Sequence, residues 1–302
     1  MNLETSVAGV KLKHPLMNAS GVLGYTCEHI LRLARYGVAA IVTKTITPKA
    51  RRGFDPPILV ELSNGGLINA VGLENPGKGV IPELVNEAKK HSIPILVSIG
   101  GVNEQEFLEV AVAANDARAD AIEINLSCPH TKGYGIEIGM DPHNVYNVVK
   151  SITSVVSIPV IAKLGLSDRV VEAAGKSLEA GARALTLINT IKSLYIDVYT
   201  LKPVLTNIFG GLSGPPIHPI AVRVVFEVYK EFKPEIIGCG GISSWVDAAE
   251  FIAAGARALQ IGTALGKDPQ KVINSILKGL RNWMLMHEFK YINEAVGISV
   301  KG

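Results

Sequence analysis

The chain has 302 residues, of which 48% are hydrophobic and 19% charged, and its formal net charge is +3. This small charge, without any long cluster of Lys and Arg, argues against a nucleic-acid-binding or membrane-surface protein. The chain has no run of about 18 apolar residues, so we expect no membrane span. The N-terminus lacks the pattern of a secretory signal. With three scattered cysteines, we expect a protein of the reducing cytoplasm without a disulfide framework.

Short apolar runs rich in β-branched residues alternate with amphipathic stretches along the whole chain. The pattern predicts strands in eight runs, at 15–21, 39–45, 94–100, 121–127, 159–165, 184–190, 235–241 and 258–264. Helical stripes with a period near 3.6 residues lie between them, as at Phe107, Val110, Ala111 and Ala114. Caps for the helices that follow are expected at Asn103, Asp141 and Asp268.

A weak internal repeat accompanies this alternation. The segments "EAGARALTLINT" (179–190) and "AAGARALQIGTA" (253–264) are nearly the same helix-to-strand unit. Repeated units with continuous apolar strands predict a parallel sheet that is buried on both faces. Eight strands point to a (β/α)8 TIM barrel that forms a single domain over residues 1–302. An open doubly wound sheet is the alternative, but no GxGxxG motif follows the first strand.

Two segments depart from the repeat, residues 46–80 and 190–217. Each is long, rich in Gly, Pro and Asn, and follows the carboxyl end of a predicted strand. Loops of this length in a compact domain are usually functional. We expect them to cover the face of the barrel that carries active sites.

Polar residues stand at the carboxyl ends of the predicted strands, where barrel enzymes place their catalytic groups. They are Asn18, Ser20, Lys44, Ser98, Asn125, Lys163, Asn189 and Thr190. Either lysine alone is expected to be a rim residue that points to water. Together, Lys44 and Lys163 indicate a site for an anionic ligand or for a cofactor that gains negative charge, because burying an unpaired ammonium is costly.

Glycine-rich turns follow the last two predicted strands, as "GCGGIS" (238–243) and "IGTALG" (261–266), and each leads towards a helix. Bare backbone lets N–H groups approach an anion, and a helix N-terminus adds favourable partial charge. Loops in these places are the usual phosphate site of the barrel fold. The glycines could serve only tight turns, but two such loops predict a phosphate-bearing cofactor.

Cys128 lies just beyond the fourth predicted strand, in the segment "SCPHTKGYGIEIG" (127–139). His130 alone gives it too few partners for a metal site, so we expect no metal. A nucleophile would need a base and an orienting group, which the sequence does not supply nearby. A general base is reasonable, since neighbouring cations can lower the pKa of a thiol from about 8.5. For Cys27 and Cys239 we expect small buried residues.

Several motifs together resemble the class 1 dihydroorotate dehydrogenases, in the same order and over nearly the whole chain. They are "VTKTIT" (42–47), "NAVGLENPG" (69–77), "INLSCPHTKG" (124–133), "IAKLG" (161–165), "LINT" (187–190), "GGLSG" (210–214), "GCGGI" (238–242) and "IGTA" (261–264). The resemblance implies a flavoprotein with one FMN per chain. Such an enzyme oxidises (S)-dihydroorotate to orotate in de novo pyrimidine (UMP) biosynthesis.

The same resemblance implies roles by position. Cys128 would be the base that removes a proton from C5 of dihydroorotate while C6 delivers hydride to N5 of the flavin. Lys44 would take part in catalysis, beside Lys163 at the flavin N1–O2 edge. Substrate contacts are implied for Asn69, Val71, Gly72, Leu73, Asn125, Asn189 and Thr190. Flavin contacts are implied for Ala19, Ser20, Gly21, Lys44, Thr45, Ser98, Asn125, Lys163, Ile188, Gly214, Gly240, Gly241, Gly262 and Thr263.

One position departs from the family pattern, because His130 stands where these enzymes usually have Asn. "SCPH" is similar to dihydropyrimidine dehydrogenase, a related flavin enzyme that reduces uracil and thymine. An imidazole offers one donor and one acceptor in a geometry unlike that of an amide. A flavin subunit acting on uracil or thymine is therefore one alternative, and a non-enzymatic barrel that binds a phosphate-bearing ligand is another. The motifs "NASGVLG" (18–24) and "NAVGLENPG" favour dihydroorotate.

The motifs further resemble the 1B subgroup, whose catalytic subunit pairs with a subunit that carries FAD and a 2Fe-2S cluster and passes electrons to NAD. Three dispersed cysteines cannot supply the four thiolates of such a cluster, so a partner would hold it. We expect a homodimer, or a heterotetramer with that electron-transfer subunit. The alternative is a self-sufficient homodimer that uses fumarate or another small oxidant.

Overall fold

Eight parallel strands form a nearly closed barrel in this computed structural model, which describes residues 1–127, 136–266 and 268–301. Their order around the barrel follows the chain, and the last strand pairs with the first. The strands are β3 Leu16–Asn18, β4 Ile41–Val42, β7 Ile95–Ile99, β8 Ala121–Leu126, β9 Val160–Leu164, β10 Ala184–Leu187, β15 Ile236–Cys239 and β16 Ala256–Ile261. The predicted (β/α)8 barrel is confirmed. A doubly wound sheet is excluded, because its strand order would reverse partway along the chain.

The seam between β3 and β4 is closed by a side chain. The Asn18 amide nitrogen donates to Val42 O at 2.7 Å, and Asn18 Oδ1 accepts from Val42 N at 3.0 Å. One side-chain amide therefore supplies the donor and acceptor that a strand peptide would supply, beside a backbone bond from Ala39 N to Leu16 O. Asn18 is fully buried and serves barrel closure, so it is not one of the site residues.

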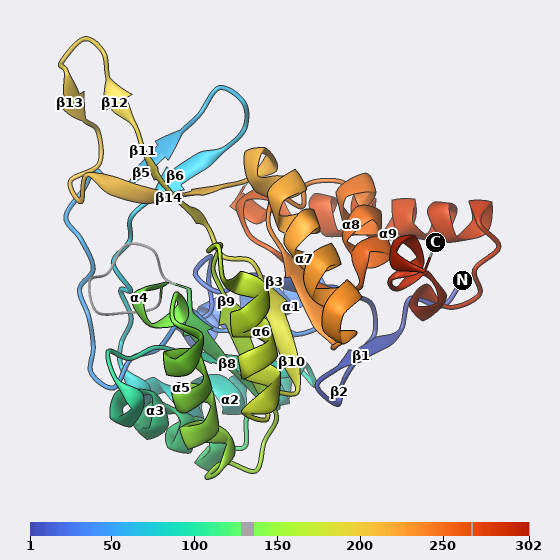
Figure 1. Cartoon of the computed structure of the whole chain (residues 1–302), viewed down its shortest axis with the longest axis horizontal. Helices are drawn as coiled ribbons and strands as arrows, with labels where there is room; N and C mark the ends of the chain where they lie inside the picture. The colour runs from blue at the N-terminus through green and yellow to red at the C-terminus, as the bar shows by residue number, and fades with distance from the viewer. Residues whose placement is uncertain (128–135, 267, 302) are drawn as a thin grey trace.

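Helices form a ring around the barrel (Figure 1). They are α1 Cys27–Tyr36, α2 Ile81–Lys90, α3 Glu104–Asp116, α4 Ile136–Gly139, α5 Pro142–Thr153, α6 Val170–Glu179, α7 His218–Phe232, α8 Trp245–Ala254 and α9 Pro269–Met286. The caps predicted at Asn103, Asp141 and Asp268 are confirmed, since each side chain accepts from a backbone N–H in the first turn of its helix. Within the described residues, no helix is both long and apolar enough to cross a membrane.

The barrel interior has two layers of different character. The lower one, here called the base layer, is apolar and consists of Met17, Val42, Leu96, Ala121, Ile161, Ala184, Ile237 and Ala258. The hairpin of β1 Thr5–Val7 and β2 Val10–Leu12 packs against it. Because side chains alternate along a strand, the next inward residue lies two positions further on. These residues form the polar layer, which is Ala19, Lys44, Ser98, Glu123, Lys163, Thr186, Cys239 and Gln260.

The two long segments predicted as loops pair with each other. They contain β5 Leu59–Glu61, β6 Leu67–Asn69, β11 Ile191–Leu194 and β14 Phe209–Ser213, which form an antiparallel sheet in the order β11–β14–β6–β5. A further hairpin, β12 Ile196–Asp197 with β13 Lys202–Pro203, projects beyond this sheet (Figure 1). The sequence analysis missed these strands because they are short, and β14 contains two glycines. Their pairing spans about 140 residues of chain, as in Gly211 opposite Asn69.

Candidate active site

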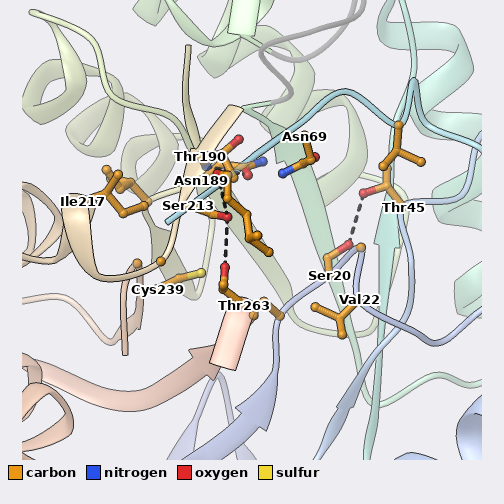
Figure 2. A pocket seen from close by; sticks show the side chains of 18 of the residues that line it. Ser20, Val22, Thr45, Asn69, Asn189, Thr190, Ser213, Ile217, Cys239 and Thr263 are labelled. Carbon is orange, nitrogen blue, oxygen red and sulfur yellow. Dashed lines mark hydrogen bonds between the residues drawn. The ribbon is translucent and has the colours of Figure 1, made fainter. Parts of the chain in front are cut away.

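A cavity of about 360 Å³ lies between the carboxyl ends of the barrel strands and the antiparallel sheet. Residues of the barrel and of the antiparallel sheet line it, such as Lys163 at the end of β9 and Asn69 at the end of β6. Every residue for which the resemblance implied a substrate contact lines this cavity: Asn69, Val71, Gly72, Leu73, Asn125, Asn189 and Thr190. Figure 2 shows Asn69, Asn189 and Thr190 grouped on one side of it. The cavity thus gathers groups that are far apart in the sequence.

Most residues with an implied flavin contact line the same cavity. They are Ala19, Ser20, Gly21, Lys44, Thr45, Asn125, Lys163, Ile188, Gly214, Gly240, Gly241, Gly262 and Thr263. Ser98 differs, because it is fully buried and absent from the cavity wall. Its hydroxyl oxygen lies 3.1 Å from Thr45 Oγ1, which in turn lies 3.2 Å from Ser20 Oγ. Ser98 therefore lies beneath the cavity wall and holds the Thr45 side chain by a hydrogen bond.

A chain of hydrogen bonds fixes the amide side of the cavity. Asn125 Nδ2 donates to Thr45 Oγ1 at 2.8 Å, and Asn125 Oδ1 accepts from the Ser127 hydroxyl at 2.7 Å. Asn189 Nδ2 donates to Ser127 Oγ at 2.9 Å, and Asn189 Oδ1 accepts from the backbone N–H of Thr190. Each amide nitrogen has two N–H donors. In the described part of the chain, one donor on Asn125 and one on Asn189 remain available to a ligand.

Lys44 is one of two nearly buried cations at the cavity. Its ammonium nitrogen lies 3.4 Å from Glu74 Oε2 and 4.8 Å from the centroid of the Tyr25 ring. Burial lowers the pKa of Lys44, and the Glu74 carboxylate partly opposes that effect. Glu74 is about half-exposed, with 49% of its side chain accessible. Solvent therefore screens the anionic partner of this lysine.

Lys163, the second cation, is held by a fully buried network. Its Nζ donates to Gln260 Oε1 at 2.7 Å and lies 3.6 Å from Glu123 Oε1. The Gln260 amide nitrogen donates to Glu123 Oε2, which also accepts from the Thr186 hydroxyl at 2.9 Å. The sequence analysis missed Glu123, Thr186 and Gln260. Their signal was a polar residue in the middle of an otherwise apolar strand.

The glycine loops after β15 and β14 pack so closely that side chains cannot fit. Gly241 has a φ of +73°, and a Cβ there would lie 2.8 Å from Gly214 O. A Cβ on Gly240 would lie 2.6 Å from the Cβ of Ala221. The first predicted loop, 238–243, therefore presents bare backbone at the cavity wall, as the phosphate-site prediction requires. In the second predicted loop, 261–266, a Cβ on Gly262 would make only an ordinary contact, at 3.6 Å from the Cβ of Ala19. Beside them, Thr263 Oγ1 donates to Ser213 Oγ at 2.9 Å (Figure 2).

The helix after the first glycine loop differs from expectation. Ser244 caps α8, and Asp247 accepts from the backbone N–H groups of Ser243 and Ser244 at 2.8 Å. Burial opposes ionisation of Asp247, but these hydrogen bonds hold its carboxyl pKa below the ordinary value. The start of α8 thus already has an anion. The second predicted glycine loop, 261–266 after β16, leads first into a short 3-10 helix, Thr263–Gly266, and then to α9.

The three cysteines have different positions. Cys128 and His130 lie outside the described residues. Cys239 is buried, as predicted, and burial raises the pKa of its thiol. The prediction was wrong for Cys27, which is only half-buried because it begins α1 and faces Glu83 on α2, whose Oε1 lies 3.2 Å from the sulfur.

Several wall residues were not found from the sequence. They are Val22, Leu59, Leu67, Ser213, Ile217, Cys239 and Gly266. Leu59, Leu67 and Ser213 belong to the antiparallel sheet, whose position over the barrel has no local sequence signal.

The fold and the cavity define a (β/α)8-barrel protein with a site for an anionic, phosphate-bearing ligand at the carboxyl ends of its strands. The site combines two cations, a glycine cradle and fixed amides. A family model described as dihydroorotate dehydrogenase matches residues 2–284. The chain therefore belongs to the dihydroorotate dehydrogenase family.

Relatives of similar length agree with this family. A dihydroorotate dehydrogenase B (NAD(+)) catalytic subunit from Thermoplasma volcanium is 45% identical over 303 residues, 99% of each chain. The catalytic subunit of the same name from Pyrococcus abyssi is 43% identical over 301 residues, again 99% of each chain. A protein of Aeropyrum pernix, provisionally named dihydroorotate dehydrogenase A (fumarate), is 46% identical over 98% of this chain and 96% of its own.

Proposed function

We propose that this chain oxidises (S)-dihydroorotate to orotate, using bound FMN, in pyrimidine biosynthesis. The observation that carries the proposal is family membership over residues 2–284, together with a single cavity that gathers the amides, both lysines and the glycine loops. Neither alternative from the sequence has equal support. The relatives described above carry dihydroorotate dehydrogenase names, and a simple phosphate-binding barrel would not require two buried lysines.

The residues around the cavity fit FMN. Its volume lies within the usual range for cofactor sites, about 300–1,000 Å³. The backbone at Gly240 and Gly241 would bind the phosphate, with Gly214, Gly262 and Thr263 beside it. Lys44 and Lys163 would face the edge of the ring that gains negative charge. When bound, the flavin would accept the hydride that leaves the substrate.

The fixed amides suit the substrate. Dihydroorotate has a carboxylate and ring carbonyls, which are acceptors, and Asn125 and Asn189 each retain an amide N–H donor for them. Asn69 adds a third amide, whose Nδ2 already donates to Gly211 O at 3.3 Å. Ser127 and Thr45 hold the amides of Asn125 and Asn189 in place. These two side chains therefore lose little conformational entropy when substrate binds.

Cys128 is proposed as the base at C5 of the substrate. It follows Ser127, which belongs to the hydrogen-bond chain of the amides. A thiol with a pKa brought towards neutrality by nearby cations can accept a proton at physiological pH. Lys44 and Lys163, which line the cavity, are cations that could assist it.

We propose an electron-transfer partner of the 1B type, carrying FAD and a 2Fe-2S cluster, with NAD as final acceptor. Two of the relatives above are named NAD-dependent catalytic subunits, and this chain has only three cysteines. The projecting hairpin has exposed apolar residues that suit a subunit contact: Val198, Tyr199 and Leu201 are 72%, 95% and 80% accessible. Reduction of fumarate by the isolated homodimer would instead support the alternative, a self-sufficient enzyme that needs no electron-transfer subunit.

An anaerobic titration tests the proposal. The purified protein should be yellow, and the released cofactor should have the mass of FMN. Dihydroorotate, dihydrouracil and NADH are then added in turn while the flavin absorbance is followed. Bleaching by dihydroorotate alone supports the proposal. Bleaching by dihydrouracil would instead indicate a flavin subunit that acts on uracil or thymine. A colourless protein that binds no flavin would favour a non-enzymatic barrel that binds a phosphate-bearing ligand.

A further inference from the structure

The network below the cavity contains a carboxylate with no direct contact to the proposed ligand site. Glu123 is fully buried, and it is absent from the cavity wall. It lies on β8 between Ala121 of the base layer and Asn125 at the cavity. Its side chain reaches across the barrel interior to Lys163 on β9, Thr186 on β10 and Gln260 on β16.

Barrel stability alone does not account for this carboxylate. Layers inside such barrels are usually filled by branched apolar side chains, as the base layer here is. A buried ion pair is often no more stable than well-packed apolar residues of the same volume. Moreover, Glu123 Oε1 accepts no hydrogen bond within the described residues and has only the ion pair with Lys163. A group kept at such a cost is a candidate for function.

The two cations of the cavity differ in how their charge is balanced. Lys44 faces the half-exposed Glu74, whose charge water screens. Lys163 faces Glu123 at 3.6 Å with both side chains almost inaccessible, so the carboxylate field acts with little screening. Gln260 holds the two together, because its carbonyl accepts from Lys163 while its amide nitrogen donates to Glu123.

We propose that Glu123 is the counter-charge of Lys163, and that it limits how strongly this lysine stabilises the reduced cofactor. This inference rests on the proposed function, since it requires a flavin above the network. Glu123 is a positioning residue, because it acts through Lys163 and not by touching the ligand. Gln260 and Thr186 serve to fix the carboxylate.

The test is the midpoint potential of the bound flavin, measured by dye equilibration in the absence of substrate. Glu123→Gln keeps the side-chain shape and removes the negative charge. We expect the potential to rise, with the reduced flavin favoured by on the order of tenfold relative to the oxidised form. Glu123→Asp, which keeps the charge, should move the potential much less. In Glu123→Gln/Lys163→Gln the potential should fall below that of Glu123→Gln alone.

Other outcomes would overturn the inference. An unchanged or lower potential in Glu123→Gln, or an equal shift in Glu123→Asp, would exclude charge balance as the role of this carboxylate. If Glu123→Gln does not fold, Lys163→Gln is compared with the double variant. Because Glu123 acts through Lys163, removing the carboxylate should then leave the potential nearly unchanged, and a shift of about tenfold or more there would overturn the inference. A wild-type protein without flavin overturns both this inference and the proposed function, whereas a flavin-loaded protein with equal potentials overturns the inference alone.

Discussion

The base layer and the polar layer of the barrel occupy the same strands, two residues apart, yet they have opposite composition. Along β8 and β9 the base layer has Ala121 and Ile161, and the polar layer has Glu123 and Lys163. The base layer buries apolar surface and so stabilises the fold. The polar layer buries charge and therefore costs stability, which suits a functional role. The difference suggests that the carboxyl end of the barrel has the chemistry and the amino end maintains the shape.

The largest expected effect is a loss of chemistry without a loss of fold. Cys128→Ala should lower turnover of dihydroorotate by about two to four orders of magnitude, because a general base usually contributes that much. FMN content and thermal stability should stay near wild type. Steady-state kinetics measure the turnover, a flavin absorbance spectrum gives the FMN content, and a thermal melt gives the stability. Turnover within a few-fold of wild type would remove Cys128 from the role of base.

The converse substitution belongs in the base layer. Leu96→Ala removes a fully buried side chain and should lower the free energy of unfolding by about 2–5 kcal/mol. Turnover per bound flavin should remain close to wild type at a temperature where the variant is folded. Urea denaturation provides the stability, and Val155→Ala at an exposed site is the control, with a change of less than about 0.5 kcal/mol. A selective loss of turnover would break the division between the layers.

The amino end of the barrel should also set an acid limit on stability. His14 Nδ1 accepts from Leu16 N at 3.3 Å, and its Nε2 lies 2.9 Å from Gly37 O, so the folded protein needs the neutral ring. Burial lowers the pKa of His14 from 6.5 to about 4. Since the unfolded chain takes up this proton first, stability is present above pH 6.5 and declines as the pH falls from 6.5 to about 4.

The full decline corresponds to about 3 kcal/mol at most. The free energy of unfolding measured at several pH values checks it, with His14→Gln as the matched variant. If His14→Gln retains the same slope between pH 6.5 and 4, another group is responsible.

A smaller effect is expected at the glycine cradle. Gly241→Ala places a methyl group 2.8 Å from Gly214 O at a positive φ, which should weaken FMN binding roughly tenfold, since such strain costs about 1–3 kcal/mol. Gly9→Ala is a matched control, because Gly9 has a similar φ of +79° but open space around it. Fluorescence titration of the flavin-free protein measures both affinities. Equal affinities would argue against a phosphate site at Gly241.

The barrel could be predicted from the sequence because each strand repeats a local pattern. Helix caps such as Asn103 and Asp141 were found for the same reason, since capping depends on residues three or fewer positions apart. The paired strands β6 and β14 were missed because nothing near Asn69 indicates Gly211 as its neighbour.

Prediction of the site followed the same rule. Lys44 and Lys163 were recognised as unusual at strand ends, and both line the cavity. Glu123 escaped notice, although it is equally unusual, because a single carboxylate within "AIEINLS" (121–127) looks like an exposed strand residue until its partners are known. Asn18 shows the opposite error, since a polar strand end can serve closure of the barrel.

Single-turnover stoichiometry tests the central claim most directly. Flavin-loaded protein is mixed anaerobically with a limiting amount of dihydroorotate, and flavin absorbance and orotate are both measured. The account predicts one orotate formed for each flavin reduced. Flavin that stays oxidised while dihydroorotate remains unchanged, or that is reduced only by dihydrouracil, would contradict it.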